Sequence, residues 1–431
     1  MKKVCVIGLG YIGLPTATIL SESGYNVVGV DTNAAVVAKI NQGNSHICES
    51  NLSEKVAKAI AEGRLRAGTL PEAADVFIIA VPTPFTADKE ADLTAVRSAA
   101  ESLLPYLRKG NLVILESTVP PRTTLDLLLP IFKKTGLEIG KELQVAFCPE
   151  RVLPGKILEE LIFNSRVVGG VDHASAFAAR ELYASFVKGD IYLTDSTTAE
   201  MTKLMENTYR DVNIALANEF ALIAEQSGVN IWEAIRYANN HPRVNIHQPG
   251  PGVGGHCIAV DPWFIVEQAG SLARLIRTAR EINDGMPGYV VERVQQLLSG
   301  VSSPRIAVLG MTYKANVADC RESPALEIIN LLREKGFFVS VCDPLAQDEQ
   351  LLPLEEALAG ADLLLLLVGH HDFRSLDPLK AAKLLRRPLV FDTRGVLERG
   401  CWERAGFLLA TLGEFFPVQK GATINENTAA H

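Results

Sequence analysis

Short apolar runs alternate with amphipathic segments through the first part of the chain. The apolar runs have the length of strands and lie at residues 3–8, 25–31, 76–81, 112–117 and 145–148. An amphipathic segment between the first two runs, residues 11–23, predicts a helix. Strands that read as continuous apolar runs and alternate with helices are typical of a parallel sheet covered on both faces. We therefore predict an α/β domain with a doubly wound sheet over residues 1–195.

The pattern then changes to a single long helix at residues 196–227. A Ser-Thr-Thr segment would cap its start, and a glycine follows its end. Further helices are expected on either side of a loop rich in Gly and Pro at residues 241–256. These elements define a predicted helical middle domain, residues 196–300, which contains the long central helix.

The alternation of strands and helices returns near Pro304. The predicted elements are a helix at residues 323–335 and strands at residues 305–310, 337–343, 362–368 and 389–392. One strand ends in Asp343, just as the second strand of the chain ends in Asp31. We predict a second Rossmann-like doubly wound domain, residues 301–416, which has lost the glycine fingerprint. A flexible tail is expected at residues 417–431.

Composition narrows the class of protein. The 431 residues are 48% hydrophobic and 21% charged, as in an ordinary globular protein, and they exceed what one core accommodates. No apolar run approaches the length of roughly 18 residues that a membrane-spanning helix needs, so we expect a cytoplasmic protein without membrane insertion. The net charge of −8 argues against nucleic-acid binding. The seven cysteines include no C-x-x-C pair, so neither a disulfide framework nor a metal site is expected.

The turn after the first strand carries a dinucleotide fingerprint. Its glycines allow a tight turn, close approach of a pyrophosphate, and packing of helix on sheet, while the helix N-terminus supplies positive charge. Asp31, at the end of the next strand, would accept hydrogen bonds from ribose hydroxyls and repel a 2′-phosphate, so NAD is favoured over NADP. A merely tight turn is the alternative. The predicted cofactor-binding residues here are Gly8, Gly10, Tyr11, Ile12, Gly13 and Asp31.

Two further turns follow apolar strands at the edge where open α/β sheets bind ligands. One contains Thr83 and Pro84, and the other contains Thr118. Their hydroxyls and backbone groups would reach the ribose and nicotinamide. Ordinary β-α turns are the alternative, since Thr and Pro are common turn residues.

Polar residues recur along one face of the long helix. Glu200, Lys203, Asn207 and either Arg210 or Asp211 have i, i+3 and i+4 spacing. A solvated stripe with an ion pair between Glu200 and Lys203 is the alternative interpretation. Beside a cofactor, a buried Lys203 would stabilise a developing oxyanion, and Asn207 would donate to the same oxygen or position a water.

Cys257 lies directly after a loop that offers almost no side chains to pack. The preceding residues include Gly254 and present accessible N–H groups suited to a phosphate or an oxyanion. A thiolate beside a nicotinamide can trap an aldehyde as a thiohemiacetal, which loses a second hydride and becomes a thioester. Asp261 would act as base toward the hydrolytic water if Cys257 starts a helix. A buried structural cysteine and a dyad with His256 are the alternatives.

Charged residues follow the first strand of the predicted second Rossmann-like domain. Lys314 and Arg321 flank the acidic Asp319, and Glu322 follows them, in the loop that corresponds to the pyrophosphate turn of the first domain. Side-chain cations at this edge would bind phosphate without a glycine turn. A solvated loop is the alternative.

Taken together, the chain resembles the nucleotide-sugar 6-dehydrogenases, the UDP-glucose and GDP-mannose dehydrogenase family. The matching segments, spread across nearly the whole chain, are VIGLGYIGLP, VPTP, EST, CPERVLPG, AEMTKLMENTYRDVNIALANE, GGHCIAVDP and DCRESPA. The resemblance implies an NAD-binding domain, a central helix that builds a homodimer, and a C-terminal domain that binds the nucleotide sugar. It also implies two successive oxidations at C6 with two NAD.

The resemblance further implies roles for single residues. Cys257 would be the nucleophile, Lys203 and Asn207 would stabilise oxyanions, Asp261 would help activate water, and Glu150 and Thr118 would work near the reacting carbon. Arg321 would contact the cofactor pyrophosphate. The implied substrate-binding residues are Arg151, Lys203, Asn207, Arg210, Arg243, Gly254 and Lys314, with Arg243 reaching across the dimer.

Within the family, HPRVNI and PGPGVGGHCIAVDPWFIV resemble the branch that oxidises UDP-N-acetyl-D-mannosamine to a uronate for surface polysaccharides. UDP-N-acetyl-D-glucosamine or another nucleotide sugar is the alternative substrate. Two rival functions stay open: a two-electron β-hydroxyacid dehydrogenase, and a non-catalytic NAD-binding regulator. Neither of these functions requires the Gly-Gly-His-Cys segment.

Overall fold

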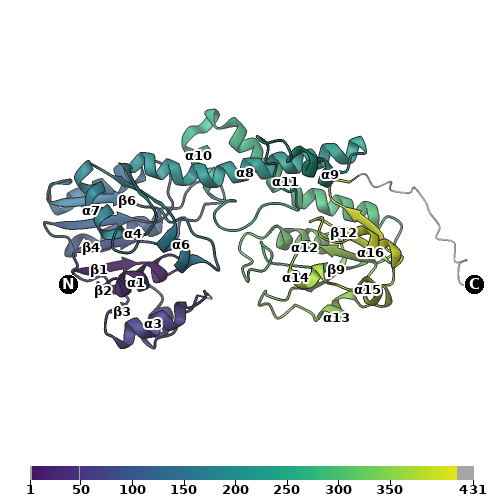
Figure 1. The fold of residues 1–431 in the computed structure, drawn as a ribbon, viewed down its shortest axis with the longest axis horizontal. Coiled ribbons are helices and arrows are strands. Elements are labelled where there is room, and N and C mark those ends of the chain that lie inside the picture. Colours follow the sequence, from purple (N-terminus) through teal and green to yellow (C-terminus); the bar gives the residue numbers. More distant parts are fainter. Residues whose placement is uncertain (1, 48, 415–431) are drawn as a thin grey trace, which may run out of the picture. The chain divides into compact units, whose positions relative to one another are not determined.

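The computed structural model of the chain describes residues 2–47 and 49–414. The chain folds into two compact units, of which the first comprises Met1–Thr208 and Val260–Arg274 and the second comprises Tyr209–Ala259 and Leu275–His431. Helix α8 (Ser196–Ser227) contributes its first turns to the first unit and the remainder to the second (Figure 1). The predicted long helix at residues 196–227 is therefore confirmed. The predicted division into three domains stays a prediction, and the tail predicted from residue 417 lies outside the described residues.

The first unit is built on an eight-stranded sheet. Its strand order is β3-β2-β1-β4-β5-β6-β7-β8, and every neighbouring pair is parallel except β6 with β7. The order reverses between β1 and β4, as in a dinucleotide-binding fold. The strands are β1 (Lys3–Ile7), β2 (Asn26–Val30), β3 (Leu65–Gly68), β4 (Val76–Ile79), β5 (Asn111–Leu115), β6 (Leu143–Phe147), β7 (Arg166–Gly170) and β8 (Ile191–Asp195).

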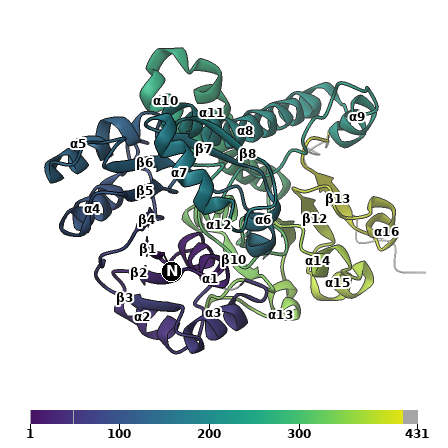
Figure 2. The ribbon, with the colours of Figure 1, turned by 60° about the vertical axis from the view of Figure 1, so that its left-hand side comes forward.

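Both faces of this sheet carry a hydrophobic core. Alternate residues of β1 point to opposite faces, so Val4 and Val6 join one cluster while Cys5 and Ile7 join the other. Figure 2 shows α4 and α5 next to β4, β5 and β6. The first cluster includes α1 (Gly13–Glu22), α3 (Leu52–Ala61), α6 (Ile157–Phe163) and α7 (His173–Tyr183), and the second includes α4 (Thr94–Leu103), the π-helix η2 (Thr124–Leu128) and α5 (Leu129–Phe132).

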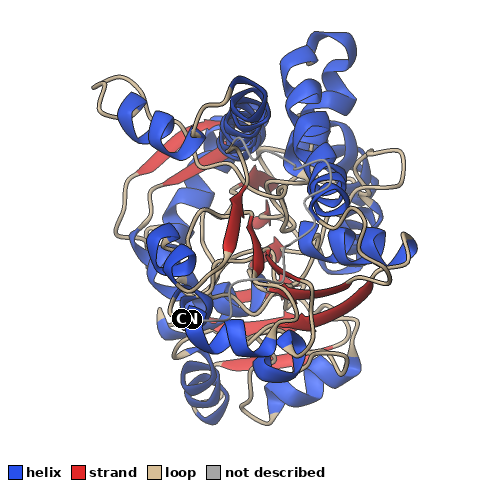
Figure 3. Cartoon of the chain, turned by 90° about the vertical axis from the view of Figure 1, so that its right-hand side faces the viewer, coloured by secondary structure: helices blue, strands red, loops and turns tan. Residues whose placement is uncertain are grey.

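The second unit contains a five-stranded sheet in which all neighbouring pairs are parallel. Its strand order is β10-β9-β11-β12-β13, a doubly wound arrangement whose order reverses between β9 and β11. In Figure 3 the strands, drawn in red, lie among blue helices. The strands are β9 (Arg305–Leu309), β10 (Phe338–Cys342), β11 (Leu363–Leu366), β12 (Leu389–Asp392) and β13 (Leu408–Thr411).

Helices again cover both faces of the second sheet. Long helices pack on one face and short ones on the other, as the two core clusters of this unit show. The long helices are α11 (Arg274–Leu297) and α12 (Pro324–Glu334), and the short ones are α13 (Leu354–Leu358), α14 (His371–Arg374), α15 (Pro378–Leu384) and α16 (Arg399–Arg404). The predicted fold class, two Rossmann-like domains with helices between them, is thus confirmed.

Four strands, β3, β7, β8 and β13, were not predicted from the sequence. They lie toward the margins of the sheets, where part of the strand faces solvent and the apolar run is shorter. In β7 the run is interrupted by Gly169 and Gly170, whose Cβ positions would lie within 2.7 Å of Ser196 and 2.2 Å of Asp172, respectively. Packing of backbone on backbone, rather than side-chain hydrophobicity, defines that strand.

No helix within residues 2–47 and 49–414 has both the length and the apolar character needed to cross a bilayer.

A buried carboxylate ties the long helix to the first sheet. Glu200 of α8 is fully buried and accepts hydrogen bonds from the backbone N of Arg122, at 2.6 Å, and of Thr124, at 2.8 Å. The Thr124 hydroxyl donates to the same carboxylate at 2.6 Å. These donors precede and open η2, so Glu200 caps that helix from another element. Burial raises the pKa of Glu200 to about 7, because the hydrogen bonds only partly offset desolvation.

We expect Glu200→Gln to change how stability depends on pH. A carboxyl group whose pKa is raised on folding stabilises the fold below its unfolded pKa and loses that contribution as pH rises through about 7. The contribution amounts to at most about 3 kcal/mol. The melting temperature of the wild-type protein should therefore fall more between pH 5 and pH 8 than that of the variant. Glu219→Gln, at an exposed position of the same helix, should behave like the wild type. An equal fall in Glu200→Gln and the wild type would contradict the assignment.

Candidate functional site

The turn from β1 into α1 has the form of a dinucleotide cradle. A Cβ at Gly13 would lie 1.8 Å from the carbonyl oxygen of Gly8, so only glycine allows this close turn. Around Gly10, in contrast, no heavy atom would lie within 4 Å of a Cβ, which leaves its backbone open to a ligand. Tyr11 and Ile12 complete the turn that leads into α1, whose N-terminal N–H groups point toward this space. The turn therefore fits the pyrophosphate of NAD.

Asp31 lies at the end of β2, next to this turn. Its carboxylate accepts hydrogen bonds from the backbone N of Leu9, at 3.1 Å, and of Asn33, at 2.9 Å. Each carboxylate oxygen has two lone pairs, so acceptor capacity remains for ribose hydroxyls. The side chain is partly exposed and accessible to such a ligand. This geometry agrees with the ribose-binding role predicted for Asp31.

The two predicted turns after β4 and β5 meet at the carboxyl edge of the sheet. The Thr83 hydroxyl, next to Pro84, donates to the carbonyl oxygen of Thr118 at 2.7 Å, and Ser117 Oγ donates to Val81 O at 2.7 Å. Both turns are thus held in one arrangement beside the dinucleotide cradle.

Helix α10 (Asp261–Ala269) is hydrogen-bonded to the segments that contain both turns. Glu267 accepts a hydrogen bond from the backbone N of Ala91, at 2.9 Å, in the segment that follows β4. Gln268 donates to the carbonyl oxygen of Pro121, at 2.7 Å, in the segment that follows β5. Neither residue was predicted. Asp261 is the first residue of α10. These hydrogen bonds therefore hold its carboxylate, a predicted catalytic group, in a defined position with respect to the two predicted cofactor turns.

A polar cluster forms along the first turns of α8. It contains Lys203 and Asn207 of that helix together with Glu150 and Asp261. Lys203 is buried and donates to the carbonyl oxygen of Glu150, at 2.8 Å, and to its carboxylate, at 3.3 Å. Asn207 Nδ2 donates to Asp261 Oδ2 at 2.6 Å. The alternative of a solvated stripe is wrong, because Glu200 caps η2 and Lys203 pairs with Glu150. Of the two candidates one turn further, Asp211 is buried and Arg210 is exposed.

Asp261 has the electrostatics of a base that works near neutral pH. Burial raises its pKa to about 7, although the charge of Lys203 and the hydrogen bond from Asn207 both lower it. The condition attached to that role, that Cys257 starts a helix, is not met: residues 256–260 form a turn, and α10 begins at Asp261. Proline at the second position of α10 fits that start, since it lacks the N–H that a first turn leaves unpaired.

In the second unit, the loop before Cys257 packs on the loop after β9. The Gly255 backbone N donates to Arg321 O at 3.1 Å. A Cβ at Gly254 would lie 2.4 Å from Glu322 O and 2.9 Å from Tyr313 Cβ, so any side chain there would separate the two loops. Cys257 itself is partly exposed, unlike the buried Cys5, Cys148 and Cys342. The alternative of a buried structural cysteine is therefore wrong for Cys257.

Apart from the buried Lys203, the cations predicted to bind substrate or cofactor are partly or fully exposed in their units. Lys314, Arg210 and Arg243 are exposed, and Arg151 is partly buried in an ion pair with Glu206. Arg321 forms a two-pronged pair with Asp319, with Nη2 to Oδ2 at 2.7 Å. Burial alone would raise the pKa of Asp319, but the hydrogen bonds from Arg321 hold it below its usual value.

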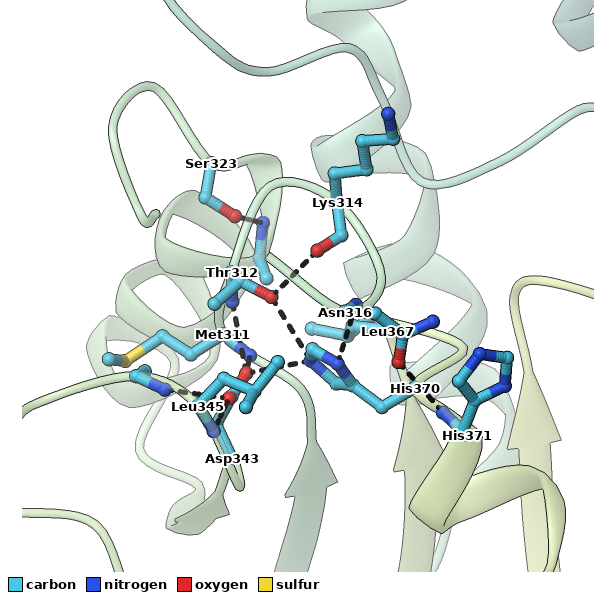
Figure 4. Close-up of polar contacts among 12 residues, drawn as sticks. Met311, Thr312, Lys314, Asn316, Ser323, Asp343, Leu345, Leu367, His370 and His371 are labelled. Carbon is cyan, nitrogen blue, oxygen red and sulfur yellow. Dashed lines mark hydrogen bonds and ion pairs between the residues drawn. The ribbon is translucent and has the colours of Figure 1, made fainter. Parts of the chain in front are cut away.

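Two buried polar clusters of the second unit escaped the sequence analysis. In one, Arg280 of α11 donates to Asp211 at 2.6 Å while Asn218 accepts from the backbone N of Gly250, at 2.9 Å, in the loop before Cys257. In the other, Asp343 pairs with His370 at the end of β11 (Figure 4). The acid at the end of β10 was a signal for the second cluster, but nothing in the sequence pointed to its partner.

Comparison with known proteins identifies the family of this arrangement. Residues 2–187 match the NAD binding domain of the UDP-glucose/GDP-mannose dehydrogenase family, residues 197–285 its central domain, and residues 307–399 its UDP binding domain.

Relatives and solved structures match over nearly full length. The UDP-N-acetyl-D-mannosamine dehydrogenase of Methanocaldococcus jannaschii is 52% identical, over 96% of this chain and 97% of that protein. The NDP-N-acetyl-D-galactosaminuronic acid dehydrogenase of Ralstonia solanacearum is 48% identical, over 92% and 96%. The structure of the UDP-D-ManNAc dehydrogenase of Pyrococcus horikoshii has a TM-score of 0.91 at 42% identity, over 95% of this chain and 99% of that one.

These matches confirm the resemblance that the motifs indicated, and they cover the cradle, the polar cluster on α8, the cysteine loop and the second sheet. The chain belongs to the UDP-glucose/GDP-mannose dehydrogenase family and is an NAD-dependent oxidoreductase.

Proposed function

We propose that the protein oxidises the C6 hydroxymethyl group of UDP-N-acetyl-D-mannosamine to a carboxylate, which supplies a uronate for surface polysaccharide synthesis. The substrate is that named for relatives such as the M. jannaschii enzyme, which is 52% identical to this chain. The observation that carries the chemistry is the cluster of the buried Lys203 and Asp261 with the partly buried Asn207, in a chain whose partly exposed Cys257 lies four residues before Asp261.

NAD supplies the hydride acceptor when bound, and an alcohol needs two such acceptors to become an acid. Between the two oxidations, Cys257 holds the aldehyde: its thiolate adds to C6, and a carbon–sulfur bond forms as the carbonyl becomes a thiohemiacetal alkoxide. Loss of the second hydride from C6 leaves a thioester. Water then adds to this thioester, the carbon–sulfur bond breaks, and the thiol and a carboxylate are released. The covalent bond keeps the half-oxidised sugar in place throughout.

The cluster on α8 serves the oxygen atoms of these steps. The Lys203 ammonium, in a buried and weakly solvated position, stabilises the alkoxide that forms at C6, and Asn207 donates to the same oxygen. Asp261, with a pKa near 7, removes a proton from the attacking water. Glu150 orients Lys203 through its hydrogen bonds, and Thr118 lies in the turn beside the predicted nicotinamide site. Four residues span at most about 14 Å, which limits the separation between the Cα atoms of Cys257 and Asp261.

The remaining proposed contacts bind the nucleotides. Arg321 contacts the cofactor pyrophosphate, Gly254 lines the sugar end of the substrate site, and Lys314 lies where the sugar joins the diphosphate and serves both. Arg151 and Arg210 extend that site, and Arg243 serves the site of a second copy. Because Cys257 must remain a free thiol, we place the reaction in the reducing cytoplasm.

The decisive experiment counts NADH against sugar. With UDP-N-acetyl-D-mannosamine and excess NAD, we expect two NADH per sugar and a product whose mass corresponds to the uronate. Cys257→Ser should bind NAD normally and form no acid at steady state, because the hydroxyl cannot carry the acyl intermediate. UDP-N-acetyl-D-glucosamine, UDP-N-acetyl-D-galactosamine and UDP-glucose, tested in parallel, should give a lower kcat/KM.

The same measurement separates the rival functions. One NADH per substrate without acid would indicate a two-electron dehydrogenase, and cofactor binding without turnover of any nucleotide sugar would indicate a regulator. Cys401→Ser, which removes an exposed thiol on α16, is the matched control and should keep full activity. Acid formation by Cys257→Ser at the wild-type rate would refute the covalent route.

Asp261 should control the pH profile of thioester hydrolysis. Only the ionised carboxylate accepts a proton from water, so the rate should rise as pH increases through about 7 and then level off. In Asp261→Asn this rise should disappear, and turnover should fall about a hundredfold or more. The first NADH should still form, and mass spectrometry should detect the acyl group on Cys257. Asp348→Asn, at an exposed loop position, is the control. An unchanged pH profile in Asp261→Asn would assign the water-activating role elsewhere.

We further propose a homodimer built through α8 and α9 (Ile231–Ala238). Large apolar side chains stand exposed along these helices, with 63% of Tyr209, 53% of Ile223 and 62% of Tyr237 accessible. A hollow between the two helices is lined by Phe220, Ile223, Val229, Ile235 and Ile246 and is almost wholly apolar. A contiguous apolar surface of this kind marks an interaction site. A second copy of the same helices is the occupant that fits, because a two-fold contact pairs a surface with itself.

The oligomer can be tested by light scattering after size exclusion. The wild-type protein should have twice the mass of the 46.7 kDa chain. Ile223→Glu should shift the protein toward a monomer, because a charge at the centre of an apolar interface is left without solvent. It should lose activity as well if Arg243 serves the neighbouring site. Leu70→Glu alters a leucine that is also exposed, 71% accessible, and lies outside both helices, so it should leave the mass unchanged. A monomeric wild type at micromolar concentration would refute the dimer.

A further inference from the structure

The switch point of the second sheet, between β9 and β11, contains a buried histidine without an assigned role. In doubly wound sheets, ligands bind outside the carboxyl ends of the strands where the order reverses. His370 lies in the segment after β11, and the loop from Thr312 to Asn316, which carries Lys314, follows β9. Only 1% of His370 is accessible to solvent, so its ring is part of the interior of this edge.

Both ring nitrogens of His370 are engaged. Nδ1 accepts a hydrogen bond from the backbone N of Asn316 at 3.0 Å. The ring proton therefore resides on Nε2, which lies 3.0 Å from Thr312 Oγ1 and 3.2 Å from Asp343 Oδ2 (Figure 4). Thr312 Oγ1 in turn donates to the carbonyl oxygen of Lys314 at 3.1 Å. One imidazole thus contacts the first and last residues of the loop and, through Thr312, its middle.

The loop needs this support because Asn316 has a left-handed backbone conformation, with φ of 61°. Asparagine tolerates that region better than most residues, but it still costs free energy that surrounding contacts must supply. Here the backbone N of Asn316 is held by His370, and its side-chain oxygen accepts from the backbone N of His371 at 3.1 Å. Two adjacent residues after β11 therefore fix the turn after β9.

Asp343 completes this arrangement and is not available to a ligand. Its Oδ2 accepts from the backbone N of Met311, at 2.6 Å, and of Thr312, at 3.1 Å, in addition to His370. Its other oxygen accepts from the backbone N of Leu345 and Ala346. Although burial alone would raise the pKa of Asp343, the hydrogen bonds from His370 and the backbone hold it far below its usual value. In the first unit, by contrast, Asp31 keeps a partly exposed carboxylate for a ribose.

We propose that His370, together with Asp343, is a positioning residue for nucleotide-sugar binding: it holds the loop of residues 312–316 in the shape that presents Lys314 to the diphosphate. Figure 4 shows the Lys314 side chain extending away from the His370 ring, and that side chain is exposed to solvent. The inference rests on the proposed function, in which Lys314 serves the substrate site. A loop that is already held in one conformation binds its ligand more tightly, because no free energy is lost in ordering the loop when the ligand binds.

The test compares His370→Phe with His370→Gln in the full-length protein. Phenylalanine keeps the ring and its edge-to-face packing on Phe373, at 5.5 Å between centroids, but loses the contacts of both ring nitrogens with Asn316, Thr312 and Asp343. We expect its KM for the UDP-sugar and its Kd for UDP to rise about tenfold or more. At saturating substrate kcat should stay within about twofold, and the KM for NAD should not change. Glutamine offers an acceptor and a donor at a similar separation and should restore most of the affinity.

Asp362→Asn is the matched control for general destabilisation. Asp362 is a buried carboxylate just before β11, at the opposite end of the same strand, where it binds the backbone N of Arg305 at 2.9 Å and Arg386 Nε at 2.6 Å. The Asp362→Asn substitution should lower the melting temperature of the protein and leave its affinity for UDP unchanged. Equal loss of affinity in Asp362→Asn and His370→Phe, or wild-type affinity in His370→Phe, would overturn the proposal. A wild-type protein that does not bind UDP would instead refute the proposed function.

Discussion

Burial of charged side chains along helix α8 is the constraint on which the rest of the structure depends. Glu200, Lys203 and Asp211 are all removed from solvent, and a buried charge is tolerated only when a partner compensates it. Each partner comes from a distant segment: η2 for Glu200, the loop after β6 for Lys203, and α11 for Asp211. The helix therefore collects polar contacts within each unit that hydrophobic packing alone would not specify.

The same constraint shapes the candidate site. Burial raises the pKa of the Asp261 carboxyl to about 7 against the opposing charge of Lys203, so the group can act as a base at physiological pH. A solvated carboxyl at the surface would show no such shift. The loop before Cys257 requires glycine at position 254. It lies so close to the backbone of residues 321–322 that a side chain on Gly254 would have no room.

The two sheets use the same topology differently. In the first, an open glycine turn and a partly exposed Asp31 leave backbone donors and a carboxylate for a dinucleotide. In the second, the corresponding acid, Asp343, is fully hydrogen-bonded by backbone N–H groups and by His370, while the loop after β9 carries the exposed side chain of Lys314. The same fold thus presents backbone donors and an open carboxylate at one switch point, and a side-chain cation at the other.

The sequence by itself determined the fold class, the long helix at residues 196–227, and most central strands, because continuous apolar runs and helical periodicity are local properties of the chain. The motifs likewise indicated the dinucleotide turn and, by resemblance, the family, and they selected Lys203, Asn207 and Cys257 as candidate site residues. Only the tertiary structure decided which of Arg210 and Asp211 is buried, that Lys203 pairs with Glu150 rather than Glu200, and that Cys257 precedes a helix instead of starting one. It also revealed His370 as the partner of Asp343. Those outcomes depend on pairs of residues far apart in the chain, and their burial and hydrogen bonds arise only when the strand ends come together at the edge of a sheet.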